Sequence, residues 1–287
     1  MKNFIKYLRK AIPETNFLRL LYHKIMAVIA AVYYRFPSEA LTVIAVTGTK
    51  GKTTTTNLIT NILSFAGEKV GMTSTANFQI GDKKWINDLK QTTLSPFKLQ
   101  GLLRQMVNEG CKYAVLETSS HAFTQSRIWG INIDVGVFTN ITPEHIEYHG
   151  NFNNYLNAKG GIFKQVTRGK RKFGVEKTLI MNADDPYFTY FNQFVSDRKV
   201  SFGLRNGNVT AKEIQRLADC SHFVLQVPNN SISVKLNLPG DFNILNSLAA
   251  DSVCIGLNIS VEKIKEGLEK SSTIQGRFEH VNKGQGY

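Results

Sequence analysis

Residues 48–54 read Gly-Thr-Lys-Gly-Lys-Thr-Thr, and this segment gives the strongest local indication of a chemical function in the chain. An apolar run precedes it and a helical pattern follows, which is the setting of a phosphate-binding loop, although its glycine spacing is shorter than usual. Backbone N–H groups and the helix N-terminus of such a loop favour phosphate oxygens. Lys52 would reach the β- and γ-phosphates, and the Thr53 hydroxyl would bind Mg²⁺. The residues predicted to bind nucleotide here are Gly48, Thr49, Lys50, Gly51, Lys52, Thr53 and Thr54. The alternative is an ordinary glycine-rich turn.

Three more polar segments follow buried strands or lead into a helix, at residues 117–122, 138–145 and 148–159. Their order and spacing, taken with the loop, resemble the Mur ligases. Within that family they are most similar to the group that adds the third amino acid to the peptidoglycan stem peptide. The Ser-Ser-His and Tyr-His-Gly elements in these segments distinguish that group, and the resemblance runs from about Val43 to the end of the chain.

The resemblance implies an ATP-dependent ligase that couples a diamino acid, lysine or diaminopimelate, to UDP-N-acetylmuramoyl-L-alanyl-D-glutamate. The γ-phosphoryl group of ATP passes to the carboxylate and gives an acyl phosphate, which the amine attacks with loss of phosphate. Two anions must approach each other in this reaction, so cations carry much of the catalysis.

The resemblance also implies two Mg²⁺ ions and a modified lysine. Thr53 and Glu117 would hold one ion, and Glu117 and His145 the second, since oxygen ligands suit Mg²⁺. Lys159 would be carbamylated, which requires a neutral amine and therefore a lowered lysine pKa. Lys52, His145 and Lys159 are the predicted catalytic residues. The alternatives are a helix-capping Glu117, a loop His145 bonded to backbone, and a solvated Lys159.

Substrate and nucleotide contacts are carried over residue by residue. The residues implied to bind substrate are Gln91, Thr92, Thr93, Ser119, Gln125 and Arg127. Those implied to bind nucleotide beyond the loop are Asn182, Asp185, Asn246 and Arg277. Gln91 departs from the family, in which Asn is common at this position.

Alternating strands and helices must position these side chains. Apolar runs predict buried strands at residues 41–47, 70–73, 112–116, 133–138 and 178–181. Helical patterns cover residues 53–65, 96–109, 153–163, 241–257 and 261–268. Three alternating segments at 209–214, 222–227 and 231–236 predict antiparallel strands. The fold class is therefore α/β, a doubly wound and mostly parallel sheet with a phosphate loop and a small antiparallel appendage.

Three regions are expected: a basic and apolar helical segment at 1–40, a central ATP-binding domain at 41–275, and the start of a linker at 276–287. The family has an N-terminal uridine-binding domain and a C-terminal amino-acid-binding domain, so we expect a truncated core. Two other functions stay open: a folylpolyglutamate synthetase-like ligase, and a noncatalytic ATP-binding partner protein at a membrane.

Composition narrows the function classes. The 287 residues carry a formal net charge of +13, but no nucleic-acid-binding motif accompanies it. Three widely spaced cysteines fit a reducing compartment, so we expect a cytoplasmic protein. The apolar run at residues 25–34 is too short to span a bilayer. Its helix either packs on the domain or lies peripherally on the inner membrane face, and both alternatives stay open.

Overall fold

A single mixed sheet forms the centre of the computed structural model, which describes residues 16–89 and 91–271. Its 11 strands lie in the order β11-β10-β9-β8-β7-β6-β1-β5-β2-β3-β4. The strands are β1 Thr42–Thr47, β2 Val70–Thr73, β3 Asn77–Ile80, β4 Lys83–Ile86, β5 Tyr113–Glu117, β6 Val135–Phe138, β7 Thr178–Asn182, β8 Arg198–Gly203, β9 Val209–Arg216, β10 Ser221–Val227 and β11 Asn230–Leu236. The helices are α2 Phe17–Tyr33, η1 Pro37–Ala40, α3 Lys52–Phe65, α4 Pro96–Asn108, α5 Ser120–Thr124, α6 Ile146–His149, α7 Phe152–Arg168, α8 Phe188–Asn192, α9 Asp241–Gly256 and α10 Val261–Glu269.

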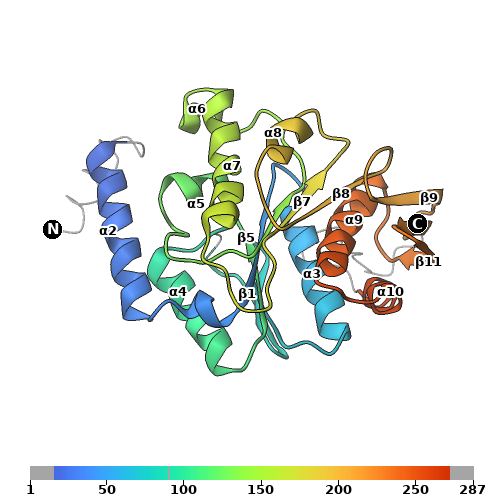
Figure 1. Cartoon of the computed structure of the whole chain (residues 1–287), viewed down its shortest axis with the longest axis horizontal. Helices are drawn as coiled ribbons and strands as arrows, with labels where there is room; N and C mark the ends of the chain where they lie inside the picture. Colours follow the sequence, from blue (N-terminus) through green and yellow to red (C-terminus); the bar gives the residue numbers. More distant parts are fainter. Residues whose placement is uncertain (1–15, 90, 272–287) are drawn as a thin grey trace, which may run out of the picture.

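Helices cover both faces of this sheet (Figure 1). Successive side chains of a strand point to opposite faces of the sheet, so a buried strand contributes side chains to the core on each face. In β1, Ile44 and Val46 belong to the core shared with α3, α9 and α10, whereas Val43 and Ala45 belong to the core shared with α4 and α7. The expected α/β architecture with two helical layers is confirmed.

The central strands β2, β5, β1, β6, β7 and β8 pair in parallel. Their carboxyl ends therefore meet at one edge, where α/β sheets bind ligands. Antiparallel strands flank this centre on both sides. β3 and β4 form a hairpin that the sequence analysis missed. The predicted antiparallel strands β9, β10 and β11 are present, and β9 joins them to β8 within the same sheet.

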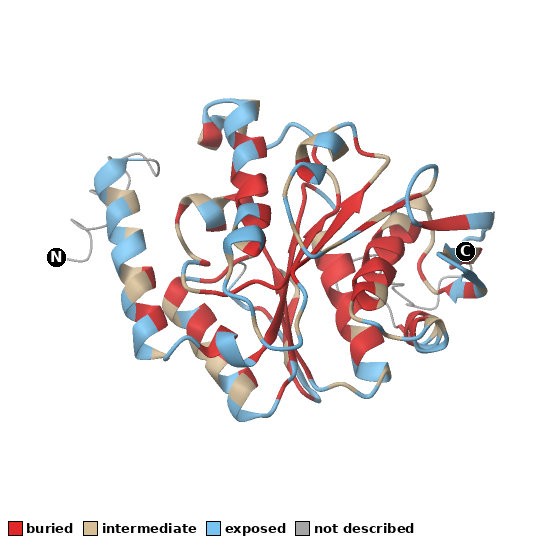
Figure 2. Cartoon of the chain, viewed as in Figure 1, coloured by how far each residue is buried: buried red, intermediate tan, exposed pale blue. Residues whose placement is uncertain are grey.

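The helix α2 packs on the domain through its small residues. Ala27, Ala30 and Ala31 are fully buried, and the rings of Tyr33 and Phe97 on α4 lie 6.3 Å apart. Figure 2 shows the opposite side of α2 exposed along most of its length. In the described residues no helix is long and apolar enough to cross a membrane. One side of α2 thus packs on the domain as predicted, and a membrane contact of its exposed side stays a prediction, while the predictions for residues 1–15 and 272–287 lie outside the described residues.

Candidate active site

The loop after β1 turns on two glycines that lie against other parts of the site. Gly51 has a φ of 84°, and a Cβ there would come 2.1 Å from Asn246 Oδ1 on α9. A Cβ on Gly48 would come 1.9 Å from Thr139 Oγ1. Any side chain at either position would clash, because these neighbours approach the loop backbone directly. The close approach keeps the loop beside the N-terminus of α3, as a phosphate site requires.

The segment after β6 holds this loop through hydrogen bonds. The Thr49 N–H donates to the Asn140 carbonyl at 2.8 Å, and the Lys50 N–H donates to Asn140 Oδ1 at 2.9 Å. Thr49 Oγ1 also lies 2.9 Å from the Tyr155 hydroxyl on α7. Lys52 Nζ donates to the carbonyls of Gly48 and Thr49, at 3.0 and 2.8 Å. These bonds set the loop backbone independently of any ligand.

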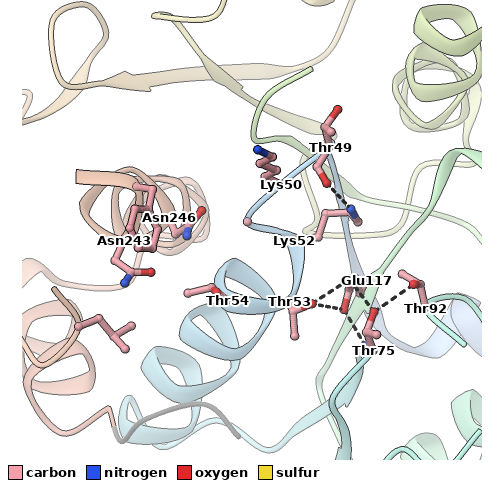
Figure 3. Close-up of a pocket in the computed structure, with 13 residues that line it drawn as sticks. Thr49, Lys50, Lys52, Thr53, Thr54, Thr75, Thr92, Glu117, Asn243 and Asn246 are labelled. Atoms are coloured by element: carbon pink, nitrogen blue, oxygen red, sulfur yellow. Dashed lines mark hydrogen bonds between the residues drawn. The ribbon is translucent and has the colours of Figure 1, made fainter. Parts of the chain in front are cut away.

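Glu117, at the carboxyl end of β5, is the buried acidic centre of the site (Figure 3). The Thr53 hydroxyl donates to its two carboxylate oxygens, at 3.0 and 3.1 Å. Thr75 donates to the same carboxylate from its N–H at 2.7 Å and from its hydroxyl at 2.9 Å. The Thr75 hydroxyl also lies 3.0 Å from Thr92 Oγ1. Thr75 was not predicted from the sequence, although it follows β2 at the same sheet edge.

The Thr53 and Glu117 oxygens fit one Mg²⁺ ion. They are hard oxygen ligands on adjacent elements, and Mg²⁺ usually takes only one or two protein oxygens, with phosphates and water completing its shell. Among the described residues no three His, Cys, Asp or Glu side chains gather as a metal site. The ring of His145 lies 5.0 Å from that of His121. Its role in a second metal site stays a prediction.

A pocket of about 380 Å³ opens between the phosphate loop and the first turns of α9. Asn246, predicted to bind nucleotide, lines it. Phe242 and Asn243 line it too and were missed, although they lie within one helical turn of Asn246. About half of the Phe242 surface is exposed. The residues of this pocket are Thr49, Lys50, Gly51, Lys52, Thr53, Thr54, Thr75, Thr92, Glu117, Leu238, Phe242, Asn243 and Asn246.

Two predicted nucleotide contacts brace the loop after β6 and do not line this pocket. Asn182 Nδ2 donates to the Thr139 carbonyl at 2.8 Å, and Asp185 Oδ2 accepts from the Ile141 N–H at 2.9 Å. Burial raises the pKa of the Asp185 carboxyl. Both residues therefore reach the phosphate loop indirectly, through residues 139–142. Arg277 lies outside the described residues.

The predicted substrate residues form a hydrogen-bonded line that starts at Glu117. Thr93 Oγ1 donates to the Glu117 carbonyl at 3.2 Å and accepts from the Ser119 N–H at 3.0 Å. Arg127 donates to the Thr93 carbonyl at 2.6 Å and to Gln125 Oε1 at 2.6 and 2.8 Å. A guanidinium held in this way is oriented for a carboxylate or phosphate. The Gln91 carbonyl accepts from Asn87, and its side chain is exposed.

Lys159 on α7 is buried, with 2% of its surface exposed, and its Nζ lies 4.7 Å from the Tyr155 ring centroid. Burial lowers the pKa of Lys159 well below its usual value; the positive charge of Lys52 lowers it further, and Glu144 opposes the shift. The alternative of a solvated surface lysine is therefore wrong. A neutral amine at neutral pH is what carbamylation requires.

An aromatic and histidine cluster lies next to Lys159. His149 Nε2 is 3.0 Å from Ser120 Oγ, and the His149 ring lies 5.5 Å from that of His121 and 5.3 Å from that of Tyr155. Burial lowers the pKa of His149 to about 4, with the positive charges of His121, His145 and Lys159 acting in the same direction. His149 is thus neutral at neutral pH.

The fold and the site define an α/β protein with a glycine-rich loop between β1 and α3 and a buried carboxylate, Glu117, beside it. The family model of the Mur ligase middle domain matches residues 46–254, and the chain belongs to the Mur ligase family.

Named relatives agree with this placement. The chain is 37% identical to the UDP-N-acetylmuramoyl-L-alanyl-D-glutamate--2,6-diaminopimelate ligase of Geobacillus kaustophilus over 265 residues, which cover 91% of this chain and 53% of that protein. It is 34% identical to the UDP-N-acetylmuramyl-tripeptide synthetase of Roseiflexus sp. over 268 residues, with the same coverage. A solved UDP-N-acetylmuramoyl-L-alanyl-D-glutamate--2,6-diaminopimelate ligase has a TM-score of 0.71 at 26% identity, covering 81% of this chain and 46% of that one. The chain spans about half the length of the curated relatives it matches.

Proposed function

We propose that this chain forms the ATP-binding core, residues 41–275, of a ligase that couples a diamino acid to UDP-N-acetylmuramoyl-L-alanyl-D-glutamate. The Geobacillus relative and the solved ligase named above carry this substrate and 2,6-diaminopimelate in their names, and the Roseiflexus relative is named as a UDP-N-acetylmuramyl-tripeptide synthetase. The γ-phosphoryl group of ATP passes to the free glutamate carboxylate and leaves ADP. The diamino acid then attacks the acyl phosphate through one amino group, which loses a proton, and inorganic phosphate leaves.

One observation carries this proposal: the phosphate loop and the predicted substrate residues meet at Glu117. Its carboxylate binds Thr53 of the loop, and its backbone carbonyl binds Thr93. A carboxylate bound along the line that ends at Arg127 would therefore approach the phosphates held by Lys52. The reacting groups are two anions, so orientation beside cations lowers the barrier to their approach.

The residues divide the chemistry among them. The loop N–H groups and Lys52 hold the phosphates, and Asn246 and Phe242 flank the base-binding side of the pocket. Mg²⁺ at Thr53 and Glu117 would neutralise phosphate charge. A carbamate on Lys159 would supply an anion for metal binding next to the loop. Arg127 would orient the substrate carboxylate.

We further propose that the enzyme acts in the cytoplasm and contacts the inner face of the membrane peripherally through α2. Eight apolar side chains of this helix are exposed, which is more than a helix facing only water carries. The nucleotide substrates are cytoplasmic, so the membrane face that meets the protein is the inner one.

The test is phosphate release from ATP with the chain and, where turnover needs it, an added C-terminal Mur ligase domain. We expect release only when UDP-N-acetylmuramoyl-L-alanyl-D-glutamate and a diamino acid are both present. Lysine and diaminopimelate, supplied separately, identify the amino acid. Release with a folate and glutamate, and none with the muramoyl nucleotide, would establish the folylpolyglutamate synthetase-like alternative. ATP binding without turnover on either substrate pair would favour the noncatalytic alternative.

A further inference from the structure

The outward face of α2 is apolar along its whole length. Nine residues of the helix are exposed, and Lys24 is the only one among them that is not apolar. The other eight are Phe17, Leu18, Leu21, Tyr22, Ile25, Ile29, Val32 and Tyr33. Leu18 is 71% exposed and Val32 58%. Surface helices usually carry their large apolar side chains inward, so α2 has the reverse arrangement.

Helical geometry makes these side chains one continuous stripe. Leu18, Tyr22, Ile25, Ile29 and Val32 follow one another at steps of three and four residues, which places them on one side of a helix. The buried alanines lie on the other side, against the domain. In Figure 2 the helix lies at one end of the molecule, with this exposed side facing away from the sheet. An exposed apolar stripe of this length indicates a surface that binds a membrane or another protein surface.

A basic groove of about 580 Å³ adjoins the stripe at Lys24. Lys164 and Arg168 on α7 line it together with Lys24, and the rings of Phe123 and Trp129 form part of its wall. The described residues that line the groove include no carboxylate. Three cations and two aromatic rings at the edge of an apolar stripe suit a phosphate group whose attached chains continue into an apolar layer.

We propose that the α2 stripe and this groove together dock on a membrane containing anionic phospholipids. The stripe enters the boundary between headgroups and acyl chains, and the groove binds a headgroup phosphate. This inference rests on the proposed peripheral membrane contact and adds the lipid class and the residues that recognise it. Interfacial helices bind through this combination of buried apolar area and attraction to anionic lipids.

Charge favours a membrane over a second copy of the chain. In the described residues 16–36, Arg19, Lys24 and Arg35 are basic and none is acidic, and Lys164 and Arg168 of the groove add two further positive charges. Two such faces would repel each other, whereas an anionic lipid surface attracts them. Tyr22 and Tyr33, both exposed on the stripe, are residues that favour the membrane interface.

The experiment is co-sedimentation of the full chain with vesicles of phosphatidylcholine alone or mixed with phosphatidylglycerol. The stripe variant is Ile25→Gln with Ile29→Gln, and the groove variant is Lys164→Gln with Arg168→Gln. The matched control is Arg205→Gln with Lys212→Gln, which removes one Arg and one Lys from exposed positions near β9, at the opposite end of the sheet. All the substituted side chains are exposed, and circular dichroism melting verifies the folding of each variant.

We expect the native chain to prefer the anionic vesicles and to lose that preference with added salt. Each Lys or Arg near an anionic surface contributes about fivefold in affinity, so the groove variant should bind them roughly 25-fold more weakly. The stripe variant should lose binding to both vesicle types, and the control should bind like the native chain.

Three results would overturn the proposal. If the groove variant and the control lost the same affinity, the overall positive charge alone would explain binding to anionic vesicles. Native-like binding by the stripe variant would exclude α2 from the membrane contact. A native dimer that the stripe substitutions dissociate would assign the stripe to a second copy. None of these substitutions lies in the candidate active site, so ATP binding and turnover test the proposed function separately. Vesicle binding without turnover would refute only the proposed ligase reaction, and turnover without vesicle binding would refute this inference together with the proposed membrane contact.

Discussion

Lys52→Met should weaken Mg²⁺-ATP binding by about 30-fold. The substitution removes the ammonium group and keeps an unbranched apolar side chain of similar length. Lys52 lies in the first turn of α3, and its Nζ already donates to two loop carbonyls, at 3.0 and 2.8 Å. Its charge is therefore held over the positions where the proposed phosphates would bind.

The magnitude follows from two opposing free-energy contributions. A unit charge about 4 Å from a phosphate oxygen contributes about 4 kcal/mol at the effective dielectric constant of a partly open site. Giving up two carbonyl hydrogen bonds costs about 1 kcal/mol each, or about 2 kcal/mol. The net of about 2 kcal/mol corresponds to about 30-fold in the dissociation constant.

Isothermal titration calorimetry with Mg²⁺-ATP measures this difference, and Lys50→Met is the matched control. Lys50 belongs to the same loop and lines the same pocket, but its side chain is exposed. Water and salt screen an exposed charge, so we expect the control to lose about threefold or less. Equal affinities of native chain and Lys52→Met, or equal losses in the two variants, would refute the assignment of Lys52 to the phosphates.

Two further predictions concern the interior of α7 and the cluster beside it. Lys159→Ala should lower turnover about 100-fold or more while ATP affinity changes less than about threefold, because a carbamate would position metal and phosphate and not the base. A short carboxylic acid should restore part of the rate. Native-like phosphate release by the variant would refute the carbamate role. His149 has a folded pKa of about 4 against 6.5 in the unfolded chain, so the unfolded state binds more protons and the native fold loses stability as pH falls from 6.5 towards 4. His149→Gln should lack this loss, and urea unfolding curves with the same pH slope for both proteins would refute it.

The buried parallel strands could be predicted because each is a short apolar run that follows a helix. Val70–Thr73 was predicted at its observed bounds, and β1, β5 and β7 within one residue at either end. The β3–β4 hairpin could not be predicted in the same way. Every residue of Lys83–Ile86 is exposed, so this edge strand has neither an apolar run nor an alternation of buried and exposed positions.

The site residues show the same difference between features that are contiguous in sequence and features that only the fold brings together. Lys52, Thr53 and Gly51 could be predicted because a phosphate loop is contiguous in sequence. Phe242 and Asn243 could not, since only the packing of α9 against α3 brings them beside the loop; Thr55 and Asn246, which mark this contact, are 191 residues apart. Thr75 depends on the sheet order, because β2 must lie next to β5 before its following loop can reach Glu117.

The proposed reaction divides this site into two halves that separate variants should distinguish. One half is the pocket between the phosphate loop and α9, where Asn246 lies against Gly51. The other is the hydrogen-bonded line from Thr93 to Arg127, which shares no residue with that pocket. Glu117 touches both halves, through its carboxylate on one side and its backbone carbonyl on the other. A change at Asn246 should therefore act on ATP affinity and a change at Arg127 on the muramoyl substrate. A change at Glu117 must act on both, because Glu117 accepts hydrogen bonds from Thr53 of the loop and from Thr93, where the line to Arg127 begins.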